Sequence, residues 1–519
     1  MDDAAYLRAQ QALPSSSASD AVQLFGSLVD AADMRHDRAV LKQLSMQAPR
    51  VRATLDSLPR DIRALEFHWG NTLSLLHAIE SQPDSVWTWD QPHLRDAIYH
   101  YRRSLSYVVA RSAGRALRVK SLVNLANALS HVGRSFDAIE QYDRAIELCP
   151  RFAMAIGNRG FAIMHLTRWL YDPSHRFLAM RQAWEDMQNA MMMPKTLEPH
   201  ATSVFQQAIT QIESCFGLDK LRTKLECPAA PVGLTDDERA YRAWSHQHRL
   251  FVNDIADFIP ASVSATDPTS LPAIVSPTRP LEQFYGLYNL MKQEFVTARW
   301  LCYSGLHSRH THFADRKVLI YNTLDYPCHS IAMDQVRIGL RAAFSVLDKI
   351  GLFINAYWKL GHAPSQVNFR LVWYVKRDRK KGLLPAIQHL RNWPLRGIYW
   401  LSLDLADKDH QETLEPESRS LQELRHKLEH QFVKVVEPLS STLNPITSPT
   451  KVFTDPRIVM YVSRPELEAK AIRVLQLVRR ALLQLSMAVQ AEEEARAKAR
   501  GNVAIGQIKM PVYSDDWKR

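Results

Sequence analysis

Residues 423–435, ELRHKLEHQFVKV, place an arginine, two histidines and a glutamate within six positions. Histidine titrates near neutral pH and can move protons, whereas arginine stays charged and binds phosphate oxygens through a planar fork of N–H donors. Together these side chains could cleave a phosphodiester without a metal ion. The same residues could also ligate zinc or form the solvated face of a helix, so three interpretations are open.

On a helix, the apolar positions of this region fall within one narrow stripe that is expected to face the core: Leu421, Leu424, Leu428, Phe432 and Val435. Arg425 lies at the edge of this stripe, whereas His426 and His430 lie nearly opposite it. A purely structural explanation is an ion pair between Arg425 and Glu429 with solvated histidines. The spacing alone does not decide, since an arginine precedes a histidine by five residues elsewhere in the chain too.

The zinc interpretation depends on the pattern H-x-x-E-H, which His426, Glu429 and His430 form. A zinc protease needs a third protein ligand. The acidic residues at a suitable distance downstream, residues 492–494, lie in what the charge pattern predicts is a solvated helix end. We therefore expect no metal site and no cofactor, and keep a zinc protease as an alternative.

The chain has 519 residues and a formal net charge of +11, which favours an acidic partner such as RNA or DNA. Its five cysteines are odd in number and lack CxxC spacing, as expected in a reducing, intracellular setting. No segment has the length and apolar character of a membrane span, and the first residues, MDDAAYLRAQ, are acidic and contain no apolar run. We expect a cytoplasmic protein without a membrane partner.

Glycine is sparse, at 17 residues, and apolar side chains recur at intervals of three and four, so an all-α fold is predicted. Prolines concentrate in residues 226–280 and interrupt helices there. The predicted parts are an N-terminal helical segment, tetratricopeptide-like helical repeats, a proline-rich connector, a helical bundle and a flexible tail, at residues 1–59, 60–216, 217–280, 281–495 and 496–519.

The repeat assignment depends on residues 119–150, VKSLVNLANALSHVGRSFDAIEQYDRAIELCP, which resemble a tetratricopeptide repeat. Small side chains at Ala126 and Ala138 would let two helices approach closely, while Leu122 and Tyr142 fill the seam. Weaker versions of the pattern on both sides predict roughly three helix pairs. Stacked pairs expose a concave groove, so we expect a protein partner there, with a structural spacer as the alternative.

In the bundle, helices are predicted at residues 281–304, 331–360, 397–405, 418–436 and 465–494. Asp348 and Lys349 are each expected to pack or pair between bundle helices. Residues 367–375 could form a short strand or an extended loop, which is followed by a basic tip, KRDRKK. This tip could contact RNA phosphates or could simply be a solvated loop. Candidate contacts to RNA phosphates come from this tip and from the predicted helix at 418–436: Lys376, Arg377, Arg379, Lys380, Lys381 and Lys434.

Residues 326–361, 396–405 and 425–435 together resemble the LA2681-like HEPN family, whose members can carry tetratricopeptide-type repeats upstream. HEPN domains are helical bundles, and many are metal-independent ribonucleases. The resemblance implies that Arg425 and His430 are the catalytic pair and that His426 is the polar residue that follows the arginine. The ribose 2′-hydroxyl would attack its own phosphate, leaving 2′,3′-cyclic phosphate and 5′-hydroxyl ends.

The resemblance also implies a homodimer through the C-terminal bundle. Arg425 and His430 lie about 140° apart around a helix and about 7.5 Å along it, so one helix cannot easily close both around a single phosphate. Two copies facing each other across a twofold axis could. By analogy with the superfamily, the expected role is a toxin or anti-phage effector regulated by the repeats. The alternative is a non-catalytic bundle that binds RNA or protein.

Overall fold

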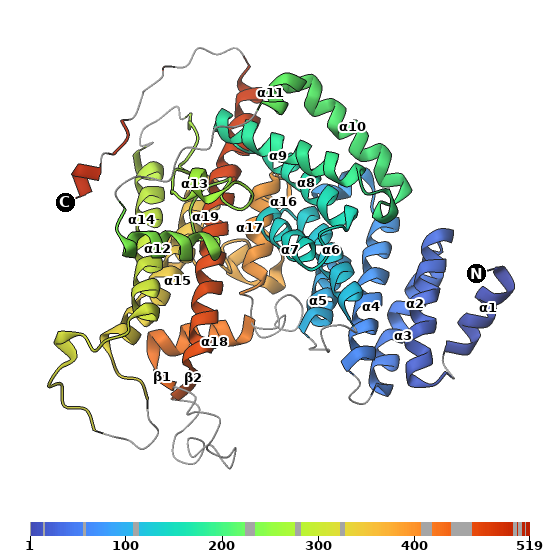
Figure 1. Ribbon diagram of the computed structural model, residues 1–519, viewed down its shortest axis with the longest axis horizontal. Helices are drawn as coiled ribbons and strands as arrows, with labels where there is room; N and C mark the ends of the chain where they lie inside the picture. The colour runs from blue at the N-terminus through green and yellow to red at the C-terminus, as the bar shows by residue number, and fades with distance from the viewer. Residues whose placement is uncertain are drawn as a thin grey trace.

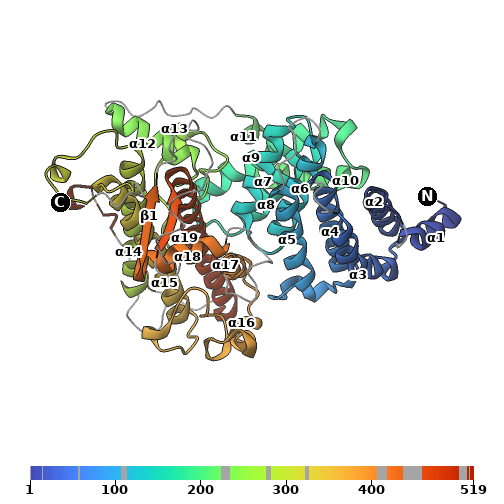
Figure 2. The same ribbon diagram turned by 90° about the horizontal axis from the view of Figure 1, so that it is seen from below.

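A computed structural model describes residues 2–13, 16–55, 59–106, 114–223, 234–275, 282–321, 327–405, 418–436, 459–501, 506, 511–513 and 515–518. Helices make up most of this part of the chain, and its named strands pair in one small sheet (Figure 1). The predicted all-α fold is confirmed. Figure 2 shows the N-terminal helices and the C-terminal bundle side by side, and one hydrophobic core runs from the first into the second.

Four helices open the described chain and share a core of their own: α1 (Asp3–Ala12), α2 (Ala18–Arg35), α3 (Arg38–Thr54) and α4 (Pro59–Glu80). Helices α2 and α3 pack on α4, and α1 packs on α2. Phe25 and Leu28 of α2 are fully buried in this core, and so are Leu41 of α3 and Leu65 of α4. The N-terminal segment therefore forms one end of the helical stack (Figure 1).

Helix pairs follow, each stacked on the next: α4 with α5 (Pro92–Ser106), α6 (Arg115–His131) with α7 (Ser135–Leu148), and α8 (Ala153–Thr167) with α9 (Pro173–Met191). The stack is completed by two further helices and two short 3₁₀ turns: α10 (Pro199–Phe216), α11 (Leu218–Arg222), η2 (Pro83–Trp87) and η3 (Pro194–Thr196). Ala126 and Ala138 have no exposed surface, and Leu122 and Tyr142 are buried with them. This arrangement is consistent with helical repeats.

The proline-rich connector contains α12 (Asp236–Gln247) and the short α13 (Ala261–Ser264). It packs on the bundle through Arg299, a buried residue of the first bundle helix. The Arg299 guanidinium donates to the Leu250 carbonyl at 2.7 Å and pairs with Asp267 at 2.8 Å. The prolines stop helices here, but the described part of the connector is still held firmly against its neighbours.

The bundle is built from α14 (Glu282–His307), α15 (Ile331–Tyr357), α16 (Pro385–Gln388), α17 (Trp393–Leu403), α18 (Ser418–His430) and α19 (Arg464–Arg500). Short 3₁₀ turns accompany them: η4 (Phe313–Asp315), η5 (Pro364–Gln366), η6 (Val375–Arg377) and η7 (Arg379–Lys381), with η9 (Asp515–Lys518) near the C-terminus. Long α19 packs against α14, α15 and α17, and its central residues are almost all buried. It is therefore the axis around which the bundle is assembled.

The predicted helix over residues 418–436 is wrong in its last part. The helix ends at His430, and Phe432–Val436 forms strand β1, which pairs in parallel with β2 (Val459–Ser463). Val433 and Val435 are buried, whereas Phe432 is 64% exposed rather than part of the core stripe. A valine-rich run favours a strand once a partner strand is available. Residues 367–375 form turns, and Tyr374 makes only a single bridge, to Leu383.

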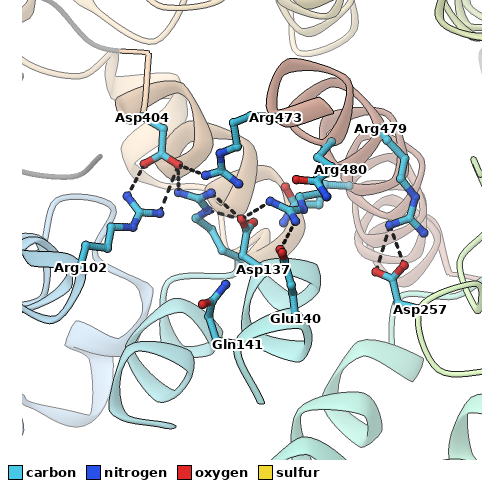
Figure 3. A network of polar contacts seen from close by, with 12 residues as sticks. Arg102, Asp137, Glu140, Gln141, Asp257, Asp404, Arg473, Arg479 and Arg480 are labelled. Atoms are coloured by element: carbon cyan, nitrogen blue, oxygen red, sulfur yellow. Dashed lines mark hydrogen bonds and ion pairs between the residues drawn. The ribbon is translucent and has the colours of Figure 1, made fainter. Parts of the chain in front are cut away.

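Buried charges join the repeats to the bundle (Figure 3). Asp404, at the end of α17, accepts from Arg102 of α5 at 2.8 Å and from Arg134 at 2.5 Å. Arg134 also pairs with Asp137 of α7 at 2.7 Å, and Asp137 accepts from Arg480 of α19 at 2.7 Å. These charges are almost completely removed from water, with Arg134 and Asp404 each 1% exposed. The repeats and the bundle therefore share one polar lattice inside one core.

The same interface includes a backbone contact between Gly133 and Gly397. Gly133 follows α6 with a φ of +91°, and a Cβ atom on Gly397 of α17 would collide with its carbonyl oxygen. That oxygen also accepts from Gln484 of α19 at 2.8 Å. Glycine at position 133 supplies the left-handed turn, and glycine at 397 leaves room for close approach.

Candidate functional site

Helix α18 is held by its apolar face. Leu421 and Leu424 have no exposed surface, and Leu428 is 2% exposed, which confirms the first three positions of the predicted stripe. The helix packs against α15. Lys427 is also buried, at 5% exposure, which the helical pattern did not predict. The orientation of α18 fixes which of its polar residues can reach solvent.

Arg425 is a quarter exposed, and its Nη2 donates to Oδ2 of Asp348 on α15 at 2.5 Å. Oδ1 of Asp348 accepts from the backbone N–H of Phe369 at 3.1 Å. The Phe344 ring lies below the guanidinium, with its centroid 5.6 Å from Cζ. A charge-assisted hydrogen bond to an anchored carboxylate fixes an arginine more firmly than solvent can. Arg425 is therefore held by Asp348 of α15, and Asp348 is in turn held by the loop that follows α15.

The expected pairing of Asp348 and Lys349 between bundle helices is confirmed, because Asp348 binds Arg425 and Lys349 binds Glu294 of α14 at 2.6 Å. The predicted ion pair of Arg425 with Glu429 remains a prediction, since the Glu429 side chain lies outside the described residues. Sequence reasoning missed Asp348 as the arginine's partner. The two residues are 77 positions apart, and only the fold brings them together.

His426 is exposed on α18, on the side that the helical wheel predicted. His430 is the last residue of α18, but its side chain lies outside the described residues, so the distance between the two members of the predicted pair is not part of this structure. The same holds for the zinc pattern, which requires Glu429 and His430. Within the described ranges, no three His, Cys, Asp or Glu side chains are grouped so that they could hold a metal ion.

The basic tip folds into the two 3₁₀ turns η6 and η7. Lys376 and Arg377 adopt positive φ angles of 52° and 56°, and Lys376, Lys380 and Lys381 are exposed. Arg377 donates to the Gln366 carbonyl at 2.9 Å, and Arg379 lies 5.6 Å from the centroid of the Tyr374 ring. The tip therefore holds its two arginines against the protein and presents its lysines to solvent.

Phe369, whose N–H binds Asp348, lies in the same loop between α15 and α16 as the basic tip and precedes the tip by only a few residues. Lys434 lies on β1 rather than on a helix, and its Nζ is 5.7 Å from the ring centroid of Tyr461, its neighbour on β2. The structure thus brings Arg425 close to Asp348 and Phe369. It places the tip and Lys434 on separate elements.

A family comparison covers this whole part of the chain. Residues 276–492 match the family model of the LA2681-like HEPN domain. The C-terminal region is an LA2681-like HEPN domain. The match extends from the start of α14 to the charged end of α19, and so includes α18 with Arg425.

This match confirms the resemblance to the family that residues 326–361, 396–405 and 425–435 indicated. No curated protein and no solved structure matches the chain. Of the helices that the structure describes, none is long and apolar enough to cross a membrane.

Proposed function

We propose that the HEPN domain is a metal-independent endoribonuclease in which Arg425 and His430 act on the scissile phosphate. The observation that carries this proposal is the position of Arg425 on α18. It is partly exposed, and its guanidinium is held by an anchored carboxylate at 2.5 Å. A guanidinium fixed in place can bind phosphoryl oxygens and stabilise the charge that develops on them.

The proposed reaction divides the work between the two residues. His430 accepts the proton of the ribose 2′-hydroxyl or donates one to the leaving 5′-oxygen, as a group that titrates near neutral pH can. Arg425 stabilises the phosphorane-like transition state, and His426 lies one residue further along the same helix. The products are 2′,3′-cyclic phosphate and 5′-hydroxyl ends, and DNA, which lacks the 2′-hydroxyl, should resist.

Asp348 has a positioning role in this proposal. Its carboxylate holds one end of the guanidinium, while the Phe369 N–H holds the carboxylate. Because the pair is a quarter to a third exposed, it contributes little to folding stability. Its value lies in orienting Arg425 before RNA arrives, which lowers the entropic cost of binding the phosphate productively.

The proposal extends to assembly and biological role. Two copies would face each other through the HEPN domain so that two Arg–His motifs line one RNA groove, with Lys376, Lys380, Lys381 and Lys434 as candidate backbone contacts. The repeats would regulate the nuclease or bind a protein partner, in a cytoplasmic toxin or anti-phage effector. HEPN domains commonly act on RNA as homodimers, which supports this arrangement.

The test is incubation of the purified full-length protein with total RNA in EDTA, followed by mapping of fragment ends. Arg425→Ala and His430→Ala should each lower cleavage by about a hundredfold or more, whereas Arg309→Ala, which changes an exposed arginine in the loop after α14, should not. Cyclic-phosphate ends that vanish in both variants support the proposal. Cleavage that persists in either variant, or that requires added zinc, contradicts it.

A non-catalytic RNA-binding domain is the second candidate, because the bond to Asp348 already occupies one nitrogen of Arg425. In that case RNA would bind without being cut. Arg425→Ala would then weaken RNA binding, and no fragment ends would appear in the wild-type reaction.

A further inference from the structure

A cavity of about 600 Å³ lies on the repeats, away from α18. Its walls come from α6, α7, α8 and α10, and it is completed by η2 and by the first residue of the HEPN helix α17. Aromatic rings dominate the lining: Trp87, Tyr142, Phe161, Trp169, Phe205 and Trp393. A hollow of this size with flat apolar walls is typical of sites for small organic ligands.

Close aromatic contacts form part of the wall of this cavity, which is partly open to solvent. Trp87 and Trp393 stand edge to face with ring centroids 5.7 Å apart at one end. The Phe205 ring packs against the backbone of Gly157 on α8, where even a Cβ atom would collide with it.

The polar groups of the cavity are mostly neutral. Burial, assisted by Arg396 and His77, lowers the pKa of His131 to about 4. Burial and Arg168 lower the pKa of His165. A neutral imidazole has one donor and one acceptor. Nε2 of His131 already lies 3.3 Å from Nε2 of His77, so only its other ring nitrogen is left for the edge of a base. No lining residue in the described chain carries a carboxylate, so an anionic ligand meets no direct repulsion.

The asparagines of the cavity are already engaged with each other. Oδ1 of Asn127 accepts from the Tyr142 hydroxyl at 2.6 Å and from Nδ2 of Asn158 at 3.1 Å. This bonding fixes the orientation of the two amides and reduces what they can offer to any ligand. They serve better as a fixed polar wall beside a ring.

One lining residue carries a permanent charge. Arg168 is exposed at the margin of the cavity, and its Cζ lies 5.0 Å from the centroid of the Trp169 ring. An arginine beside an aromatic wall can bind phosphate while a base stacks on the ring. The cavity thus combines a stacking surface, neutral hydrogen-bonding edges and one cation at its margin.

We infer that this cavity is a nucleotide-binding site, in which a base stacks between Phe161 and the tryptophans and a phosphate contacts Arg168. The site is distinct from Arg425 and does not depend on cleavage of RNA. Because Trp393 begins α17, an occupant would touch both the repeats and the HEPN domain.

The contact with α17 continues behind the tryptophan. The Arg396 guanidinium lies 4.2 Å from the Trp393 ring centroid and donates to the Thr88 carbonyl at 3.1 Å. It also donates to the His131 carbonyl at 2.5 Å. A ligand that contacts Trp393 would therefore contact a side chain that packs on Arg396, and Arg396 already connects the HEPN domain to the repeats by hydrogen bonds.

Isothermal titration of the full-length protein with AMP, GMP, CMP, UMP and adenosine tests the inference. At least one nucleotide should bind at one site per chain, and Phe161→Leu, which removes the ring but keeps an apolar side chain, should weaken binding roughly tenfold. Arg168→Ala should abolish the preference for AMP over adenosine. Arg144→Ala, an exposed arginine of α7 outside the cavity, should change neither.

Arg425→Ala should leave nucleotide binding intact, which separates this site from the proposed nuclease. The inference is overturned if no nucleotide binds at millimolar concentration, or if Phe161→Leu and Arg168→Ala both leave binding unchanged while the variants remain folded. It is also overturned if the nucleotides fail and a tryptophan-containing peptide binds in a Phe161-dependent way, because the cavity would then be a peptide site.

Discussion

An arginine–aspartate ion pair occurs both at the interface between the repeats and the HEPN domain and at the Arg425 site, but its surroundings differ. At the interface, Arg134 and Asp404 are each 1% exposed and belong to a lattice of several charges. The side chains of Arg425 on α18 and Asp348 on α15 are 25% and 30% exposed, and their hydrogen bond lies beside solvent. The first pair cannot be broken without leaving a buried charge, whereas the second can exchange one partner for another.

Electrostatics sharpen the contrast. Burial by itself would raise the pKa of Asp404, but Arg102 and Arg134 more than reverse this and hold that pKa below its ordinary value. The same balance, with Arg134 and Arg480, lowers the pKa of Asp137. The interface carboxylates are therefore committed to the charged state. An arginine that is to meet phosphate needs a looser arrangement, and α18 provides one.

The largest effect is expected at the interface. Asp404→Ala would leave Arg102 and Arg134 facing each other without their shared carboxylate, and it should lower the free energy of unfolding by about 3–5 kcal/mol. Thermal denaturation of the full-length protein measures this. Asp348→Ala is the matched control and should cost about 1 kcal/mol or less. Equal losses in the two variants would remove the distinction between the pairs.

The second-largest effect is expected from acid, which should weaken the interface. His131 has a folded pKa of about 4 against about 6.5 when unfolded, so the unfolded chain binds more protons between these values. Its contribution to stability is complete above pH 6.5 and is lost as the pH falls toward 4. At pH 5 this loss amounts to about 1–2 kcal/mol. Denaturant titrations at pH 7.5 and 5 measure the loss. His131→Gln should flatten this dependence, and an unchanged slope would contradict it.

A smaller effect is expected from Asp348→Asn. The amide can still accept a hydrogen bond from Arg425 but lacks the charge, so cleavage should fall by roughly tenfold, mainly in kcat, while thermal stability stays within about 0.5 kcal/mol. Asp348→Glu should recover part of the activity. A change in KM alone would show that Asp348 acts on RNA binding rather than on the orientation of Arg425.

The smallest effect is expected from the basic tip. Replacing Lys380 and Lys381 with alanine should weaken RNA binding a few-fold and lower the slope of log affinity against log salt by about 1.4, since each lost phosphate contact removes about 0.7 for a single strand. Filter binding at several salt concentrations measures the slope. An unaltered slope would identify the tip as a solvated loop.

The sequence predicted those features that depend on local periodicity. Leu421, Leu424 and Leu428 repeat at helical intervals, and the structure buries all three. The run from Phe432 was misread because Val435 fits both a helical stripe and the alternation of a strand, and the choice depends on β2, which lies more than twenty residues further along. Periodicity cannot show which distant strand is available as a partner.

The partners of charged residues were beyond sequence reasoning. Arg425 could be identified from its motif, but its bond to Asp348 requires α18 to cross α15. Asp404 gave no signal at all, because its partners Arg102 and Arg134 come from the repeats. The aromatic cavity could not be predicted from the sequence either, because Trp393 of the HEPN domain completes a wall that is otherwise formed by the repeats.

The contact between Gly133 and Gly397 constrains how proteins of this architecture can diversify. Where domains are joined by a free linker, recombination can attach a ready-made sensor to an old effector. Here a transplanted repeat array would have to arrive with a glycine at that turn and an aspartate at the position of Asp137. New specificity is therefore expected to accumulate by point substitution on the side of the repeats that faces away from the bundle, while their bundle-facing side changes little.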